Sequence, residues 1–141
     1  MTRDEITALF ERRHEAYNRH DIAALADCYA DDSVIESPLA GGAATGRDAI
    51  AKLSRTFFDA FPDVTLQTDD LLIDGDHVAL IGRLAGTDRG GFMGMAPTGR
   101  SFNIAIVLRC VLAEGLITRE RRIYDFNGLL VQVGTIKVKP V

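Results

Sequence analysis

Apolar residues recur at helical spacing near the start of the chain. Residues 2–18 carry them along one face, which predicts an amphipathic first helix. Asp21 is the expected N-cap of a short second helix that runs as far as Tyr29 and ends at Asp31 and Asp32, because paired aspartates favour turns. The chain is therefore expected to open with two helices.

The next segment combines a short strand, a loop and a third helix. Residues 33–37 are predicted to form a strand that Pro38 ends. Residues 39–46 are small and glycine-rich, which predicts a loop. Apolar side chains then return at helical spacing through residues 50–61, and Pro62 is expected to close this third helix.

Long strands are predicted in the second half of the chain. Their expected ranges are 64–73, 77–88, 100–112 and 116–125. Short turns join the first two and the last two of these strands, which predicts an antiparallel meander. Helices followed by such strands indicate an α+β domain in which N-terminal helices pack in a curled antiparallel sheet.

The strand expected over residues 100–112 has an unusual run at its centre. Residues 104–108 are apolar on both strand faces, whereas a sheet with one wet face would alternate. One face is expected to meet the helices. The other needs a cover, and since the chain has no spare helix, a second copy of the protein is the simplest candidate. We therefore expect a homodimer formed through the sheet.

Length and composition are those of one ordinary globular domain. The chain has 141 residues, of which 47% are hydrophobic, 26% charged and 7% aromatic, and this excludes disorder, collagen and disulfide-dense miniproteins. Residues 1–141 are thus expected to form a single domain. The formal net charge is −4, whereas proteins that bind nucleic acids or anionic membranes usually carry a broad basic surface, so neither partner is expected.

Cysteine usage and the chain start bear on location. Cys28 and Cys110 lie far apart among apolar residues, as buried free thiols do. The first residues lack the apolar stretch of a secretory signal, and no run approaches the roughly 18 apolar residues of a membrane span. We therefore expect a cytoplasmic protein.

The histidines and glycines of the chain show neither a metal-binding nor a nucleotide-binding motif. His14, His20 and His77 have no mutual ligand spacing, so no metal site is expected. The glycines of residues 86–99 fit neither a P-loop nor a dinucleotide fingerprint and predict a mobile loop instead. We therefore expect no cofactor.

Several short motifs occur in a fixed order between residues 17 and 134. They are Tyr17-Asn-Arg-His-Asp21, Tyr29-Ala-Asp-Asp32, Gly46-Arg47, Phe61-Pro-Asp63, Gly86-Thr87, Gly94 with Pro97-Thr-Gly-Arg100, Tyr124-Asp125 and Gln132-Val-Gly134. In this order and spacing the chain resembles the SnoaL-like polyketide cyclases, within the wider nuclear transport factor 2-like, ketosteroid-isomerase-like superfamily. The resemblance implies one SnoaL-like domain with the fold of a cone-shaped α+β barrel, whose wide mouth holds an apolar pocket.

The resemblance also implies a catalytic residue, Asp125. In cyclases of this family an aspartate at the end of the last strand serves as acid-base in an intramolecular aldol ring closure. A carboxylate that faces an apolar cavity would have a raised pKa and could exchange protons with a polyketide carbonyl. The alternative interpretation is that Asp125 caps the helical turn that begins at Asn127 and Gly128.

A set of apolar side chains is expected to bind the hydrophobic substrate. Alternation assigns Phe102 and Ile104 to the interior together with aromatic residues of the helices, and a glycine-rich loop adds side chains that could form a lid. The expected binding residues are Tyr17, Phe57, Phe61, Phe92, Met95, Phe102 and Ile104, with Met93 beside them in the lid.

The chain departs from its relatives in ways that leave the reaction open. The base and tyrosine positions of the steroid isomerases fall on Ser37 and near Arg13, so that route is not expected. Some cyclases pair their aspartate with a histidine on the neighbouring strand, which this chain lacks. The pattern leaves open whether Arg121 or Arg122 faces the pocket. An aldol-type cyclase is expected; a hydroxylase or isomerase on the same scaffold, or a non-catalytic small-molecule-binding dimer, are the alternatives.

Overall fold

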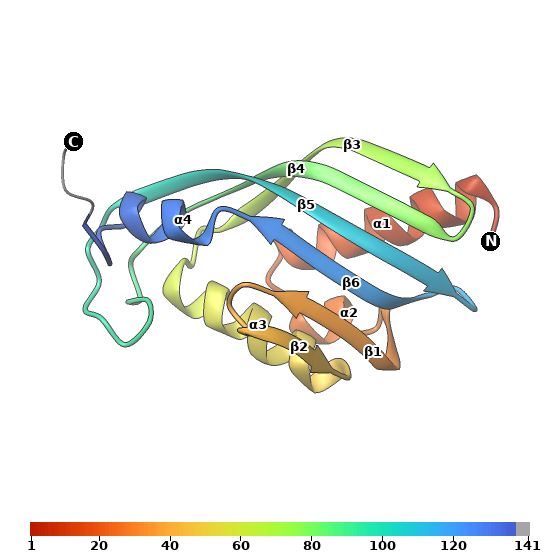
Figure 1. The fold of residues 1–141 in the computed structure, drawn as a ribbon, viewed down its shortest axis with the longest axis horizontal. Coiled ribbons are helices and arrows are strands. Elements are labelled where there is room, and N and C mark those ends of the chain that lie inside the picture. Colours follow the sequence, from red (N-terminus) through yellow and green to blue (C-terminus); the bar gives the residue numbers. More distant parts are fainter. Residues whose placement is uncertain (138–141) are drawn as a thin grey trace.

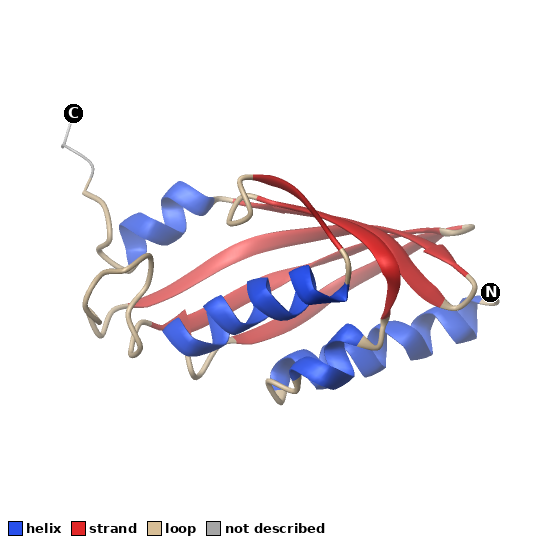
Figure 2. Ribbon diagram, turned by 90° about the horizontal axis from the view of Figure 1, so that it is seen from below, coloured by secondary structure: helices blue, strands red, loops and turns tan. Residues whose placement is uncertain are grey.

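Helices pack against one face of a curled six-stranded sheet (Figure 1, Figure 2). The computed structural model describes residues 1–137. The helices are α1 (Arg3–Asn18), α2 (Ile22–Ala26), α3 (Arg47–Ala60) and α4 (Phe126–Gln132). The strands are β1 (Tyr29–Ser37), β2 (Gly42–Thr45), β3 (Thr65–Asp74), β4 (His77–Thr87), β5 (Ser101–Ala113) and β6 (Leu116–Tyr124). The expected α+β class is confirmed.

The sheet has the strand order β2-β1-β6-β5-β4-β3. Strands β3 to β6 form the expected antiparallel meander. Strand β1 lies antiparallel to β2 but parallel to β6, so that Ile35 is opposite Glu120. The two edge strands, β2 and β3, do not pair with each other, and the sheet is therefore curled but open. The parallel pair brings the first strand of the chain beside its last strand.

Two expectations for the first third of the chain are wrong. Helix α2 ends at Ala26, and Tyr29, Asp31 and Asp32 lie in β1 instead of in or just after a helix. Pairing with β6 overrides the local helical pattern, because it buries Tyr29 completely while the two aspartates stay largely exposed. The segment expected to be a loop contains β2, whose small residues gain strand structure by pairing with β1.

The inner face of the sheet carries the core. Phe102, Ile104, Ile106 and Leu108 are buried at alternate positions of β5, which confirms their assignment to the interior. Phe61 is fully buried near the end of α3, and its ring centroid lies 4.7 Å from that of Phe102. Such tilted aromatic contacts stabilise more than burial of area alone. Together with Phe57 and Phe92, these two rings form an aromatic cluster at one end of the interior.

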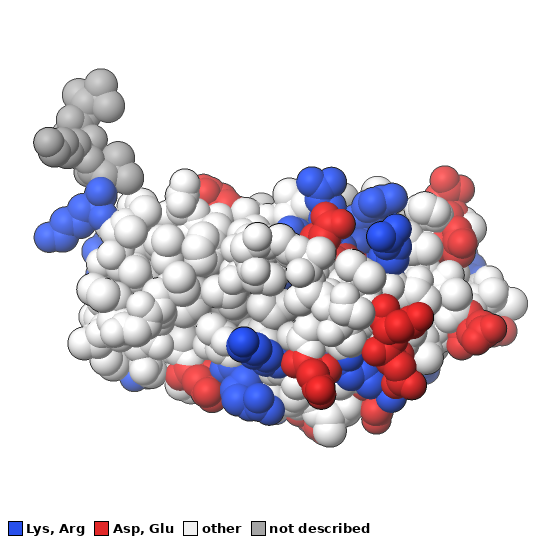
Figure 3. All heavy atoms as spheres, turned by 60° about the horizontal axis from the view of Figure 1, so that its bottom comes forward, with Lys and Arg blue, Asp and Glu red and all other residues white. Residues whose placement is uncertain are grey.

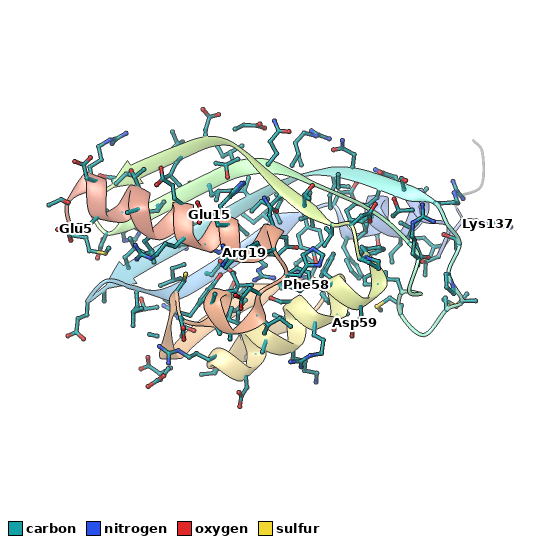
Figure 4. The ribbon with its side chains drawn as sticks, turned by 180° about the vertical axis from the view of Figure 1, so that it is seen from behind. Glu5, Glu15, Arg19, Phe58, Asp59 and Lys137 are labelled. Atoms are coloured by element: carbon teal, nitrogen blue, oxygen red, sulfur yellow. The ribbon has the colours of Figure 1, made fainter. Side chains whose placement is uncertain are left out.

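Phe58 of α3 holds the helices together. In Figure 4 it lies beyond the end of α1, where Glu15 and Arg19 extend toward solvent. Its ring stacks on His20 at 4.0 Å and meets the edge of Tyr17 at 5.1 Å. His20 also contacts the Val64 carbonyl oxygen at 2.8 Å, so this histidine has a structural role.

The helices are short, and the first of them is capped at its N-terminus. The longest, α1, has 16 residues and its N-cap is Thr2, whose hydroxyl accepts the backbone N–H of Glu5. No helix within residues 1–137 combines the length and apolar character needed to cross a membrane.

The outer face of the sheet also carries apolar residues. Val107 of β5 lies opposite Ile81 of β4 on one side and Ile123 of β6 on the other. Ile123 is half exposed, whereas Ile104 and Ile106 on the same run point inward and are buried. The apolar run therefore serves both faces of the sheet, and a row of three apolar side chains crosses its outer face.

Candidate functional site

A small cavity lies in the interior, between α1, α3 and the inner face of the sheet. Its volume is about 20 Å³, room for roughly one water molecule. Four of its lining residues have polar groups, Arg13, Tyr17, Arg122 and Tyr124, and the others are apolar. The apolar lining consists of Phe57, Leu66, Leu84, Ile106 and Leu108. The cavity is thus an apolar space with polar groups from α1 and β6.

A buried hydrogen-bond network supports those polar groups. The Arg13 Nε donates to the Tyr29 hydroxyl at 2.8 Å, and this hydroxyl donates to Glu120 Oε1 at 2.6 Å. The Arg122 Nε donates to Glu120 Oε2 at 2.8 Å. The Arg13 Nη2 lies 3.4 Å from Glu120 Oε1. One carboxylate therefore links two guanidinium groups and a phenol from α1, β1 and β6.

The network keeps its ionised groups charged. Burial alone would raise the pKa of the Glu120 carboxyl, but Arg122, Arg13 and their hydrogen-bonded neighbours outweigh it and hold that pKa below its ordinary value. Burial alone would lower the pKa of each guanidinium, yet Glu120 and Tyr29 outweigh it and raise both. Both arginines are cations and Glu120 is an anion at neutral pH.

The tyrosines of the site are neutral hydrogen-bonding groups. Burial raises the pKa of Tyr17 to about 12 and raises that of Tyr29 further. Burial also raises the pKa of Tyr124, and outweighs Ser37, Arg122 and the Leu39 backbone, which act in the opposite direction. Tyr17 and Tyr124, which line the cavity, keep their protons at neutral pH and can donate a hydrogen bond to a bound oxygen.

Three donors of the cavity lining have no hydrogen-bond partner within residues 1–137. They are Nη1 of Arg13, Nη2 of Arg122 and the Tyr124 hydroxyl, all buried. Buried donors without partners are costly, because they lose their bonds to water. The lining residues that carry these donors come from α1 and β6.

The sequence pattern contained part of this site. Arg13 stands on the apolar stripe of α1, and Glu120, Arg122 and Tyr124 follow one another at alternate positions of β6. Charges on both faces of that strand hid the inward face from sequence reasoning. The structure turns Arg122 inward, whereas Arg121 lies outward, 3.6 Å from Glu36.

Asp125 lies outside this network. It is exposed at the end of β6 and forms the N-cap of α4, where its Oδ1 accepts the backbone N–H of Gly128 at 2.8 Å. The expectation that it faces an enclosed apolar cavity is wrong, because the chain turns outward after Tyr124 to begin α4. A catalytic role for Asp125 stays a prediction.

The expected substrate-binding residues fall into three groups. Tyr17 and Phe57 line the cavity. The buried residues Phe61, Phe92, Phe102 and Ile104 belong to the surrounding core and do not line it. Met95 is 54% exposed on the surface. Their binding roles stay predictions.

The loop between β4 and β5 is anchored at both ends. Asp88 accepts hydrogen bonds from the backbone N–H of Gly91 and from both the backbone and hydroxyl of Thr98. Phe92 inserts into the aromatic cluster, 5.7 Å from the Phe57 ring. Phe92 therefore plugs the interior, while Met93 and Met95 remain outside.

The surface around this loop is poor in charge. Figure 3 shows a broad area without charged side chains toward the end of the molecule where α4 and the β4–β5 loop lie. Met93 and Met95, both more than half exposed, belong to that loop. A hydrophobic ligand would meet an apolar surface at this end.

A larger groove lies elsewhere, between α1 and β3. Its volume is about 630 Å³, and its polar lining includes His14, which is 3.1 Å from Asn18 Nδ2. The groove is open and does not contain the buried network. Within residues 1–137, no group of three or more His, Cys, Asp or Glu side chains is arranged to hold a metal ion.

Comparison with known proteins places these observations in a family. The profile described as SnoaL-like polyketide cyclase matches residues 7–133. Comparison with functionally curated proteins gives no match.

Several solved structures share the fold over nearly the whole chain. AclR, a proposed hydroxylase from Streptomyces galilaeus, is 27% identical with a TM-score of 0.85, over 99% of this chain and 87% of that chain. IdmH, a proposed polyketide cyclase from Streptomyces antibioticus, is 29% identical with a TM-score of 0.73, over 91% and 97%. A proposed polyketide cyclase from Xanthomonas campestris pv. campestris is 22% identical with a TM-score of 0.84, over 93% and 98%.

Proposed function

Because the chain belongs to the SnoaL-like polyketide cyclase family, we propose that it is a cofactor-free enzyme that acts on a hydrophobic, polyketide-like or aromatic carbonyl compound by aldol-type acid-base chemistry. The observation that carries the proposal is the interior cavity, in which buried donors without partners stand beside apolar walls. Such a cavity suits a carbonyl oxygen on a hydrophobic molecule.

The donors match the charge that develops in an aldol ring closure. A base takes a proton from the carbon next to one carbonyl group, and the electron pair of that C–H bond moves toward the carbonyl oxygen as an enolate. The enolate carbon then forms a C–C bond to a second carbonyl carbon, and the resulting alkoxide takes up a proton. Arg122 and Tyr124 would stabilise the enolate oxygen as its charge grows.

Asp125 is the proposed proton carrier. It directly follows Tyr124, a residue of the cavity lining, and is exposed to solvent. A carboxylate there can receive the proton from the substrate carbon and exchange it with water. Glu120 is unsuited to this role, because its oxygens already accept hydrogen bonds within the network.

Substrate binding requires the interior to widen. The cavity of about 20 Å³ is far smaller than the several hundred Å³ of a typical ligand pocket. We propose that Phe92 leaves the aromatic cluster to make room, since it is carried by the glycine-rich loop between β4 and β5. Phe57, its neighbour on α3, would then contact the substrate.

A cofactor-free hydroxylase is the second candidate. The likeness to AclR, a proposed hydroxylase 27% identical to this chain, favours it. Both reactions begin with a carbanion next to a carbonyl group, so the same donors would serve. Cyclisation rearranges the bonds of the substrate, whereas hydroxylation needs dioxygen as a co-substrate: one oxygen atom enters the product, and the other is reduced to water by electrons from the substrate. The mass of the product separates the two.

Stabilisation by hydrophobic ketones tests the cavity proposal. Planar aromatic polyketide-like ketones are expected to raise the Tm of the wild type, because they bind the folded state alone. Phe57→Ala removes a lining ring and should weaken that shift, while Leu72→Ala changes an exposed side chain of β3 that does not line the cavity and should preserve it. The proposal fails if sugars or nucleotides raise the Tm and the ketones do not. Saturable ketone binding without any product would favour a binding module.

Asp125→Asn separates catalysis from capping. We expect turnover to fall by about 10²-fold or more, while the free energy of unfolding changes by no more than about 0.5 kcal/mol, because asparagine is also a good N-cap. Asp21→Asn is the matched control, since Asp21 caps α2 through a similar bond of 3.0 Å to the Ala24 N–H. Asp21→Asn should leave turnover unchanged. Full activity of Asp125→Asn would reduce Asp125 to a cap.

We also propose that two copies of the chain associate through the outer face of the sheet. The apolar row of Ile81, Val107 and Ile123 crosses three adjacent strands there. Arg121 and Glu36 lie close together on the neighbouring strands, as expected for the polar rim of an interface. Association would remove the half-exposed Ile123 from water.

A further inference from the structure

The buried network does not balance its own charge. Arg13 and Arg122 are cations and Glu120 is an anion, so the three groups together carry one excess positive charge. The adjoining phenols of Tyr17 and Tyr29 are neutral and leave that excess in place. An uncompensated charge in the interior is costly. A feature of this kind calls for a negatively charged partner.

Glu120 cannot compensate the second positive charge, because it carries one negative charge and both of its oxygens already have partners. Its Oε1 accepts from Tyr29 and lies 3.4 Å from Arg13, and its Oε2 accepts from Arg122. The Cys110 thiol approaches Oε1 as well, at 3.9 Å, and burial raises the pKa of that thiol, so it is neutral. The outer nitrogens, Nη1 of Arg13 and Nη2 of Arg122, therefore keep unused N–H groups.

Both arginines line the same cavity, from opposite elements. Arg13 comes from α1 and Arg122 from β6, and Glu120 fixes each guanidinium on its inner side. We propose that the cavity binds a hydrophobic organic anion, whose delocalised oxyanion, an enolate or a carboxylate, lies between Arg13 and Arg122. The inference rests on the proposed function and narrows its substrate class to compounds that enter with a negative charge.

This substrate class explains how the site works without a buried base. A compound with two carbonyl groups on one carbon ionises far more easily than a simple ketone, and its enolate already holds the carbon nucleophile. The two guanidinium groups would select that ionised form and hold its oxygen, so the carbon proton is lost before the compound is bound. The proton transfer left to Asp125 is then delivery of a proton to the alkoxide that forms with the C–C bond. Glu120 acts as a positioning residue, which aims both arginines and touches no reacting atom.

A matched pair of probes tests the charge. 2-Naphthoate carries a carboxylate and 2-naphthamide is a neutral compound of nearly the same shape. We expect the wild type to bind naphthoate at least about tenfold more tightly than naphthamide at neutral pH, measured by calorimetry. In Arg122→Met, which keeps the apolar stem and removes the donors, the ratio of the two dissociation constants should fall to about one.

The neighbouring arginine provides the control. Arg121 precedes Arg122 but points outward beside Glu36, so Arg121→Met should keep the wild-type ratio. Arg13→Met tests the second guanidinium independently, and should also abolish the preference, since Arg122 and Glu120 remain as a balanced pair. Far-ultraviolet circular dichroism verifies that each variant is folded. Arg122→Lys retains the charge and should retain part of the preference.

The outcomes separate this inference from the proposed function. Equal binding of both probes to the wild type, or an unchanged ratio in folded Arg122→Met and Arg13→Met, would overturn the charge inference and leave an apolar ketone site. Binding of neither probe would overturn both. A preference that Arg121→Met abolished as well would place the anion on the surface and also refute the inference.

Discussion

Replacing Glu120 with glutamine is expected to lower the free energy of unfolding by about 3–5 kcal/mol. The carboxylate is fully enclosed and holds Arg13, Arg122 and Tyr29, so its loss leaves two buried guanidinium groups close together without a counter-charge. Denaturation in urea, followed by circular dichroism, measures the change. A loss of this size is a large share of the stability of an ordinary domain.

The matched control is Glu36→Gln. Glu36 also pairs with an arginine of β6, Arg121, but both side chains are more than half exposed. Exposed pairs contribute little, so this variant should lose less than about 1 kcal/mol. If Glu36→Gln and Glu120→Gln lowered the free energy of unfolding by similar amounts, burial would not be the reason for the large effect expected at Glu120.

Acidification offers a second measure of the same group. The folded state holds the pKa of Glu120 below its ordinary value, so the stabilisation is fully present above the unfolded pKa of about 4.3 and is lost as pH falls through the folded pKa. The difference in unfolding free energy between wild type and Glu120→Gln should therefore be constant near neutral pH and narrow in acid. A difference that widened in acid would mean that folding raises the pKa of Glu120 instead of lowering it.

Val107→Glu is expected to convert a dimer into a monomer. The wild type should sediment as a dimer at micromolar concentration, and a carboxylate at the centre of the apolar row would be buried without a partner in each subunit. We expect the dissociation constant to rise at least about a hundredfold, from a cost of about 3 kcal/mol or more. Analytical ultracentrifugation across a dilution series measures it.

Lys52→Glu controls for added negative charge. Lys52 is exposed on α3, a helix on the inner side of the sheet, so this variant should remain a dimer. A wild type that stayed monomeric at high concentration would refute the interface, because the outer row would then be stable in water. Circular dichroism distinguishes a folded Val107→Glu monomer from an unfolded chain.

The local pattern of the sequence determined the elements and several of their faces. Apolar spacing located α1 and α3, and alternation assigned Phe102, Ile104, Ile106 and Leu108 of β5 to the interior. These predictions succeed because helix and strand periods are properties of neighbouring residues. The short motifs, in their order, carried the resemblance to the family that the profile match then established.

Tertiary structure decided what the local pattern left ambiguous. Tyr29 follows α2 closely enough to suggest helix, and only its place beside β6 makes it the first residue of β1. Strand β2 likewise exists through its pairing with β1, since glycine and alanine carry no strand pattern of their own. Asp125 could have been enclosed or exposed, and the start of α4 turned it outward.

The buried network of Arg13, Tyr29, Glu120 and Arg122 shows most clearly which features local pattern predicts and which only tertiary contacts decide. Alternation on β6 allowed Glu120 and Arg122 to share a face but could not say that the face was the inner one, because a charged residue is buried only where a partner compensates it. Those partners lie far away in sequence: the bond from Tyr29 to Glu120 joins residues 91 positions apart. The parallel pairing of β1 with β6 brings Tyr29 to this carboxylate, and the Arg13 side chain reaches it from α1. No local period contains that information.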